Sequence, residues 1–229
     1  MTIFKDWTTF EKYWLITFTL INLYLFFAWD DSILGFISAL SGMLCVVLVA
    51  KGKISNYYFG IVQTSTYAYI AYTYALYGEA MLNAFFYFPI QFIGIYLWRK
   101  NQTSSSIKGE DIRIKRMTRK GWIRLTLLVL VSIFLYALFL TNIGGKSVYI
   151  DSTTNVLSIV AQILMIRRFA EQWIFWIMVN IFSIILWLTS LWTTGGNEIS
   201  MLVMWTAFLV NSIYGYINWT KLYRQQKEV

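Results

Sequence analysis

The chain alternates between long apolar runs and short polar connections along its whole length. Most runs approach the roughly 20 residues that an α-helix needs to cross a bilayer, so the pattern predicts membrane-spanning helices. Eight segments can be distinguished, namely Trp14–Trp29, Ile33–Ala50, Tyr57–Tyr77, Ala80–Trp98, Trp122–Leu140, Asn155–Ile166, Trp173–Trp192 and Met201–Trp219. The sixth segment is short, and it reaches spanning length only if its helix begins near Val148 and includes Asp151. Residues 1–12 mix polar and aromatic side chains, which suits an amphipathic entry at the membrane surface.

Composition supports an all-α integral membrane protein. Of the 229 residues, 58% are hydrophobic and only 13% are charged, whereas a soluble domain carries about 25% charged residues. The single proline, Pro89, leaves nearly all of the helices free to run uninterrupted. The absence of histidine excludes His-ligated metal sites and Ser-His catalysis. The lone cysteine, Cys45, lies in an apolar run and is interpreted as a small packing residue.

The positive charge predicts the orientation of the chain in the membrane. The net charge is +8, and with eight spans and a cytoplasmic N-terminus every Lys and Arg except Lys146 falls on the cytoplasmic side. This distribution obeys the positive-inside rule, so both termini are predicted to be cytoplasmic. The basic loop from Arg99 to Arg124 therefore has a topological explanation, and nucleic-acid binding is not needed to account for it.

An internal repeat divides the chain. The fourth and eighth segments both end in Gly-x-x-x-Trp, at Gly94 to Trp98 and at Gly215 to Trp219. Because a single helix separates the two groups of three, both groups have the same orientation in the membrane. The predicted divisions are an N-terminal amphipathic segment with a leading helix (1–30), a first three-helix bundle (31–98), the basic loop with a connector helix (99–143), a second three-helix bundle (144–220) and a cytoplasmic tail (221–229).

A stripe of aromatic and amide side chains in the seventh segment is the candidate binding site. Trp173, Trp176 and Asn180 are spaced so that they share one face of a helix, and the stripe runs about 10 Å in depth from the cytoplasmic edge. An aromatic belt at the interface would explain Trp173, but it does not explain Asn180, because an unpaired amide in hydrocarbon is costly. Paired indoles suit a flat or cationic ring. Trp173 is interpreted either as a ligand contact or as a cytoplasmic gate.

Further amides lie in other segments. Gln91 follows Pro89 by two residues, where the helix is expected to kink and free a carbonyl group. On the last segment, Asn211 and Tyr214 share a face and extend the candidate site by geometry alone. For Gln63, Asn83 and Gln162, hydrogen bonding between helices is an explanation at least as good.

The middles of the predicted spans carry no carboxylate. Carriers coupled to protons or sodium typically place one there, or unwind a helix, so the sequence favours an uncoupled carrier or channel. No metal, cofactor or catalytic residue is predicted. An intramembrane enzyme or a scaffold that does not transport remains as an alternative, although the sequence lacks the histidines and paired carboxylates that most hydrolytic sites use.

These residues together resemble the PnuC family of bacterial nicotinamide riboside transporters. The resemblance covers nearly the whole chain and rests on four motifs: Trp173-x-x-Trp176-x-x-x-Asn180, the series Asp151, Gln162 and Arg167, the turn Tyr77-Gly78-Glu79, and Phe88-Pro89-x-Gln91-Phe92-x-Gly94-x-x-x-Trp98. It implies a SWEET-like 3+1+3 helix core with an additional N-terminal helix, a homotrimer, and facilitated diffusion of nicotinamide riboside across the bacterial inner membrane.

The resemblance also implies a vitamin site at Trp173, Trp176, Asn180 and Gln91. Net uptake would come from phosphorylation by a separate nicotinamide riboside kinase, since the chain has no Gly-x-x-x-x-Gly-Lys-Ser/Thr fingerprint. Another flat-ring vitamin, such as thiamine or riboflavin, remains as an alternative substrate, because two indoles accept any flat ring.

Overall fold

A computed structural model describes residues 7–28, 32–73, 77–103, 110–142, 148–194 and 199–228. Within these ranges the regular structure is helical, and the elements are α1 (Thr9–Ala28), α2 (Ile33–Ala50), α3 (Asn56–Thr73), α4 (Tyr77–Leu82), the π-helical segment η1 (Asn83–Tyr87), α5 (Phe88–Lys100), α6 (Arg119–Asn142), α7 (Val148–Ile166), α8 (Gln172–Thr194) and α9 (Ile199–Glu228). Since α4, η1 and α5 are continuous, the described ranges contain eight helical rods, one for each predicted segment.

Among the described residues, four helices are long and apolar enough to cross a membrane: Ile33–Ala50, Ala80–Lys100, Arg119–Asn142 and Val148–Ile166. The sixth predicted segment is one of them, and its helix begins at Val148 as its length required. A shorter apolar helix, Gln172–Ile185, lies within α8. The helix α3 is 18 residues long, but its tyrosines, threonines and Gln63 make it less apolar than the four candidate spans.

The rod that contains Pro89 is widened rather than broken. In η1, just before the proline, the Phe88 N–H donates to the carbonyl of Asn83, five residues back. A π-helical turn of this kind accommodates a residue that has no N–H to donate and whose ring would collide with a tight helical turn. The predicted Tyr77-Gly78-Glu79 turn is instead the first turn of α4, and its side chains lie outside the described residues, as do Asp30, Asp31, Lys146 and Glu198.

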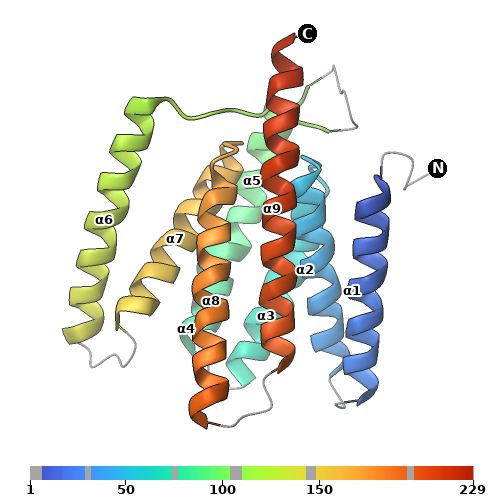
Figure 1. The fold of residues 1–229 in the computed structure, drawn as a ribbon, viewed down its shortest axis with the longest axis vertical. Helices are drawn as coiled ribbons and strands as arrows, with labels where there is room; N and C mark the ends of the chain where they lie inside the picture. The colour runs from blue at the N-terminus through green and yellow to red at the C-terminus, as the bar shows by residue number, and fades with distance from the viewer. Residues whose placement is uncertain are drawn as a thin grey trace. The chain divides into compact units, whose positions relative to one another are not determined.

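The chain divides into two compact units, Met1–Arg113 and Ile114–Val229. In the first unit α1 packs on α2, α2 on α3, and α3 on the α4–η1–α5 rod. In the second unit α6 packs on α7, α7 on α8, and α8 on α9 (Figure 1). The boundary falls inside the predicted basic loop. The finer division into five parts stays a prediction.

The two units contain the same turn, between α2 and α3 in the first and between α7 and α8 in the second. Gly52 and Arg168 both adopt left-handed backbone conformations, with φ of 69° and 66°. The N–H groups of Lys53 and Phe169 each donate to a carbonyl five residues back, at 3.0 Å in both turns. This pattern is a Schellman cap, which ends one helix and redirects the chain into the next. The sequence marks only the first turn with a glycine.

Two residues of the basic loop hydrogen-bond to these turns, each within its own unit. The Asp111 N–H donates to the Gly52 carbonyl at 2.9 Å, and the Lys115 N–H donates to the Arg168 carbonyl at 2.8 Å. Part of the predicted cytoplasmic loop therefore donates hydrogen bonds to the carbonyl groups of both left-handed turns.

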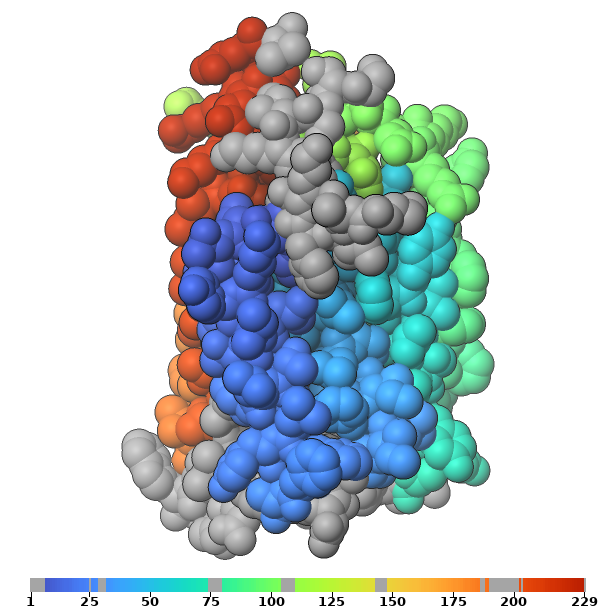
Figure 2. All heavy atoms as spheres, turned by 90° about the vertical axis from the view of Figure 1, so that its right-hand side faces the viewer, coloured from blue at the N-terminus to red at the C-terminus, as the bar shows by residue number. Residues whose placement is uncertain are grey.

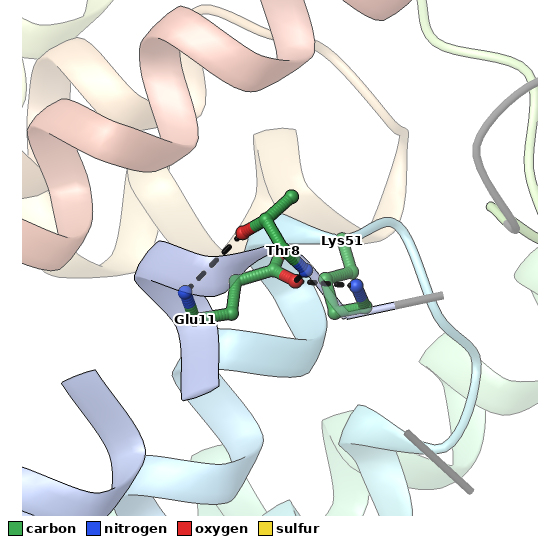
Figure 3. A network of polar contacts seen from close by, with 3 residues as sticks. All are labelled: Thr8, Glu11 and Lys51. Carbon is green, nitrogen blue, oxygen red and sulfur yellow. Dashed lines mark hydrogen bonds and ion pairs between the residues drawn. The ribbon is translucent and has the colours of Figure 1, made fainter. Parts of the chain in front are cut away.

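A buried ion pair joins α1 to the end of α2. Thr8 and Glu11 form a capping box, in which the Thr8 N–H donates to Glu11 Oε2 at 2.8 Å and the Glu11 N–H donates to Thr8 Oγ1 at 3.2 Å (Figure 3). The same Glu11 oxygen lies 2.6 Å from Lys51 Nζ, and the two side chains are only 2% and 4% exposed. The capping box precedes the first turn of α1, which is formed by Thr9 to Lys12. The helix α1 lies along α2 (Figure 2).

Candidate functional site

Five of the six predicted site residues lie on α8 and α9 of the second unit, and the start of α8 is held by its surroundings. The Ala170 N–H donates to the Lys115 carbonyl at 3.0 Å. The carboxylate of Glu171 is buried and lies 3.0 Å from Nε of Arg116. The Arg116 guanidinium also donates to Thr220 Oγ1 of α9 at 3.2 Å. The helix dipole stabilises a carboxylate at the start of a helix. The dipole and the ion pair with Arg116 both hold Glu171 in place, and this helps to fix where α8 begins.

The indole of Trp173 fills the interface between α8 and α9. It is 2% exposed, and a Cβ placed on Gly215 would come within 2.5 Å of its Cζ2 atom. It also meets the Trp219 ring edge-on, with centroids 6.0 Å apart. The Gly-x-x-x-Trp motif of α9 is therefore the surface that receives Trp173.

Trp176 lies in a different environment. It is half-buried and packs against the apolar core of the second unit, which α6, α7 and α8 build from Val129, Val156, Leu157, Val160, Ala161, Leu164, Phe175 and Val179. The predicted stripe is therefore divided between two neighbours, because Trp173 faces α9 while Trp176 packs against this core.

Asn180 is buried and reaches across to α9. Its Nδ2 donates to Ser212 Oγ at 2.9 Å, and Ser212 Oγ in turn donates to the Phe208 carbonyl at 2.8 Å. The other predicted α9 residues flank this contact, with Asn211 buried and Tyr214 half-buried. Ser212 was not among the predicted residues, and a serine within an apolar run carries no signal that separates it from an ordinary packing residue.

Gln91 belongs to the first unit and packs against α3. It is 4% exposed, and its Nε2 donates to the Tyr87 carbonyl at 3.0 Å. Its Oε1 lies against Gly60 and is buried with no hydrogen-bond partner among the described residues. The sequence predicted a kink and a freed carbonyl group near Pro89. The structure has the π-helical segment instead, and the Gln91 side chain binds the carbonyl of Tyr87, the last residue of that segment.

Other buried polar groups lie at the start of α8 and on α7. Gln172 is fully buried, and neither of its amide atoms has a partner among the described residues. The same holds for the indole nitrogen of Trp173 and for Nε2 of Gln162 on α7. In the described part of the chain no group of three or more Cys, Asp or Glu residues could hold a metal ion. Apart from the buried ion pairs of Glu11 and Glu171, the buried polar groups described above are neutral amides, hydroxyls and indoles.

These features define a polytopic α-helical membrane protein whose buried polar groups are suited to a neutral or cationic organic ligand. A family model described as "Nicotinamide mononucleotide transporter" matches residues 32–221. The chain is 43% identical to the nicotinamide riboside transporter PnuC of Neisseria mucosa, over 97% of this chain and 85% of that protein. It is 41% identical to the Haemophilus influenzae protein of the same name, over 96% of this chain and 94% of that protein.

A solved structure agrees with these relatives. The crystal structure of the vitamin B3 transporter PnuC superimposes with a TM-score of 0.83 at 42% identity, covering 96% of this chain and 94% of that chain. The chain therefore belongs to the PnuC family of nicotinamide riboside transporters, which confirms the resemblance found in the sequence. It is a multi-pass membrane protein of a transporter family and not an enzyme.

Proposed function

We propose that this chain carries nicotinamide riboside across the bacterial inner membrane by facilitated diffusion. The observation that carries the proposal is that the Trp176 indole lies one turn before Asn180 on α8, and that the Asn180 NH₂ group is already bound to a protein acceptor, Ser212. Indole faces attract the cationic pyridinium ring, and free amide oxygens accept from the carboxamide and the ribose hydroxyls. Within the second unit the proposed contacts are Trp176 and Asn180 of α8, with Asn211 and Tyr214 on α9. Within the first unit the proposed contact is Gln91.

Trp173 has a separate place in this proposal. Because its ring is packed on Gly215 and Trp219, its main contribution is to hold α8 against α9. Ligand contact or gating at the cytoplasmic edge would require this packing to open.

A riboside fits the chain better than the mononucleotide named in the family description. Phosphate groups are usually bound by Arg or Lys, and the sequence has neither from residue 54 to 98, from 148 to 166 or from 172 to 220. The relatives in Neisseria mucosa and Haemophilus influenzae are both named for the riboside. Thiamine or riboflavin remains the alternative substrate, because indole stacking alone does not distinguish flat rings.

The rest of the proposal concerns assembly and energetics. Two parallel three-helix bundles joined by α6 would form a SWEET-like core with α1 as the additional helix, and the repeated turns at Gly52 and Arg168 support such a duplication. In α6 the buried residues are Val129 and Ala137, so most of its apolar surface is available to lipid or to other copies in a homotrimer. Both termini are cytoplasmic by the positive-inside rule. Uptake is driven by a separate kinase that phosphorylates the vitamin after entry.

Counterflow in liposomes tests substrate and mechanism together. Purified protein is reconstituted with unlabelled nicotinamide riboside inside, the proton and sodium gradients are collapsed, and entry of labelled riboside is measured. We expect exchange to persist without the gradients, and Trp176→Ala to weaken apparent affinity about tenfold through loss of an indole contact. Trp122→Ala is the matched control, because this indole stacks on Phe175 beside the same core and is not a proposed contact.

Each part of the proposal can fail separately. Exchange that stops when the gradients collapse would rule out uniport. Stronger competition by unlabelled thiamine or riboflavin than by the riboside would change the substrate. No flux of any vitamin through folded protein would favour a scaffold, and equal effects of the two tryptophan variants would remove Trp176 from the site.

A further inference from the structure

The contact between α8 and α9 fixes which way the Asn180 amide points. Ser212 has one hydroxyl proton, and that proton is donated to the Phe208 carbonyl at 2.8 Å, because a carbonyl can only accept. The serine oxygen can therefore only accept from Asn180, so the group that lies 2.9 Å away must be the amide NH₂. The contact with Ser212 therefore leaves the carbonyl oxygen as the end of the Asn180 amide that is available to accept a hydrogen bond.

Gln91 repeats this polarity within the first unit. Its NH₂ group is bound to the Tyr87 carbonyl at 3.0 Å, and its oxygen is buried with no partner among the described residues. A buried acceptor without a donor is costly, and a ligand that brings N–H or O–H groups would relieve that cost. Both proposed amides are thus held as acceptors.

We infer that Ser212 is a positioning residue that makes the site select a ligand carboxamide over a carboxylate. The inference rests on the proposed function and deepens it. A carboxamide has N–H groups to give to the Asn180 oxygen, whereas a carboxylate has none and would face that oxygen with its own negative charge. The sequence from Gln172 to Thr220 contains no Lys or Arg that could compensate a carboxylate.

Without the Ser212 hydroxyl, the Asn180 amide is free to turn over. Its NH₂ group would then be able to face the ligand and to donate to a carboxylate. Removing the Ser212 hydroxyl should therefore change the ratio of affinities for a carboxamide ligand and a carboxylate ligand. A general loss of packing would weaken both ligands and leave the ratio unchanged. The conservative variant Ser212→Thr keeps the hydroxyl and should keep the preference.

The experiment measures dissociation constants by calorimetry for nicotinamide riboside and for nicotinic acid riboside, which differ only in the carboxamide. We expect the wild-type protein to favour the carboxamide by at least about tenfold, the usual cost of leaving buried polar groups unpaired. In Ser212→Ala the ratio of the two constants should fall by at least about fivefold, while Ser212→Thr retains it. Thr206→Ala is the matched control, because its hydroxyl also donates to a carbonyl four residues back, Leu202 at 2.7 Å, and its side chain is exposed.

The outcomes separate this inference from the proposed function. Wild-type protein that binds neither riboside would contradict the proposed function. Wild-type protein that binds nicotinamide riboside while Ser212→Ala keeps the full wild-type ratio would overturn the role of Ser212 and leave the function standing. Equal changes of the ratio in Ser212→Ala and Thr206→Ala would also overturn it.

Discussion

The two units hold their helices together with the same kind of joint, built from an aromatic ring, a glycine and a tryptophan. In the first unit Tyr57 of α3 lies on Gly94 of α5 and meets the Trp98 ring edge-on at 5.0 Å. In the second unit Trp173 of α8 lies on Gly215 of α9 and meets Trp219 edge-on at 6.0 Å. The two Gly-x-x-x-Trp motifs in the sequence therefore form the same kind of packing contact in both units. Small residues let helices approach closely in membranes, where the hydrophobic effect does not drive helices together.

The polar side chains next to the joints differ between the units. In the first unit, Oε1 of Gln91 lies against Gly60. The Thr64 hydroxyl donates within its own helix, to the Gly60 carbonyl at 2.8 Å. In the second, Trp176 and Asn180 lie one and two turns beyond Trp173, and Asn180 binds across to Ser212. The packing contact is common to both units, whereas the hydrogen bonds of the neighbouring amides differ. Gln91 donates within its own helical rod, and Asn180 donates across to the next helix.

The largest difference expected between the units concerns the residue that precedes each left-handed turn. Lys51 is buried against Glu11 of α1, whereas Arg167, at the corresponding position of the second turn, is exposed. Breaking a buried ion pair by removing one partner costs about 3 kcal/mol. Lys51→Met should therefore lower the free energy of unfolding by about that amount, measured by titration with a denaturing detergent.

Arg167→Met is the matched control for this prediction. An exposed side chain contributes within about 0.5 kcal/mol, so this variant should unfold like the wild type. If both variants lost the same stability, the buried pair seen in Figure 3 would not be what distinguishes the two turns.

The glycines of the two joints provide the second test. Alanine is normally about 1 kcal/mol better than glycine inside a helix. At Gly94 and at Gly215 the added methyl group would collide with the Tyr57 and Trp173 rings, respectively. Overpacking costs about 1–3 kcal/mol, so both substitutions should lower the thermal unfolding midpoint in detergent despite their helix propensity.

Gly42→Ala is the control for the joint variants. A Cβ there would lie 3.2 Å from Cγ of Gln63, a flexible side chain that can move aside. We expect it to leave the unfolding midpoint unchanged or to raise it. A gain in stability at Gly94 or Gly215 would mean that the aromatic ring does not occupy the glycine surface, and the comparison between the joints would fail for that unit.

The sequence predicted the helices more fully than it predicted the contacts among polar groups. Hydropathy located every helical rod, and length alone placed the start of α7 at Val148. The Asn180–Ser212 bond could not be found in this way, because it depends on the rotation of two helices about their axes. Nor could the left-handed turn at Arg168, since an arginine carries no turn signal and its backbone is held by the hydrogen bonds around it.

The turns also allow the smallest of these tests, because glycine occupies one left-handed position and arginine the other. Gly52 has φ of 69°, and a Cβ there would lie 3.3 Å from Cβ of Glu110. Gly52→Ala should cost about 1 kcal/mol of unfolding free energy, from the left-handed backbone and from this close contact. Gly52→Asn meets Glu110 with the same Cβ atom, but asparagine tolerates the left-handed region better, so its cost should be smaller by a few tenths of a kcal/mol. Because both variants carry the same Cβ atom, the difference between their unfolding free energies measures the backbone strain. Equal costs would show that the contact with Glu110, rather than the left-handed φ, explains why this turn has glycine while the other has Arg168.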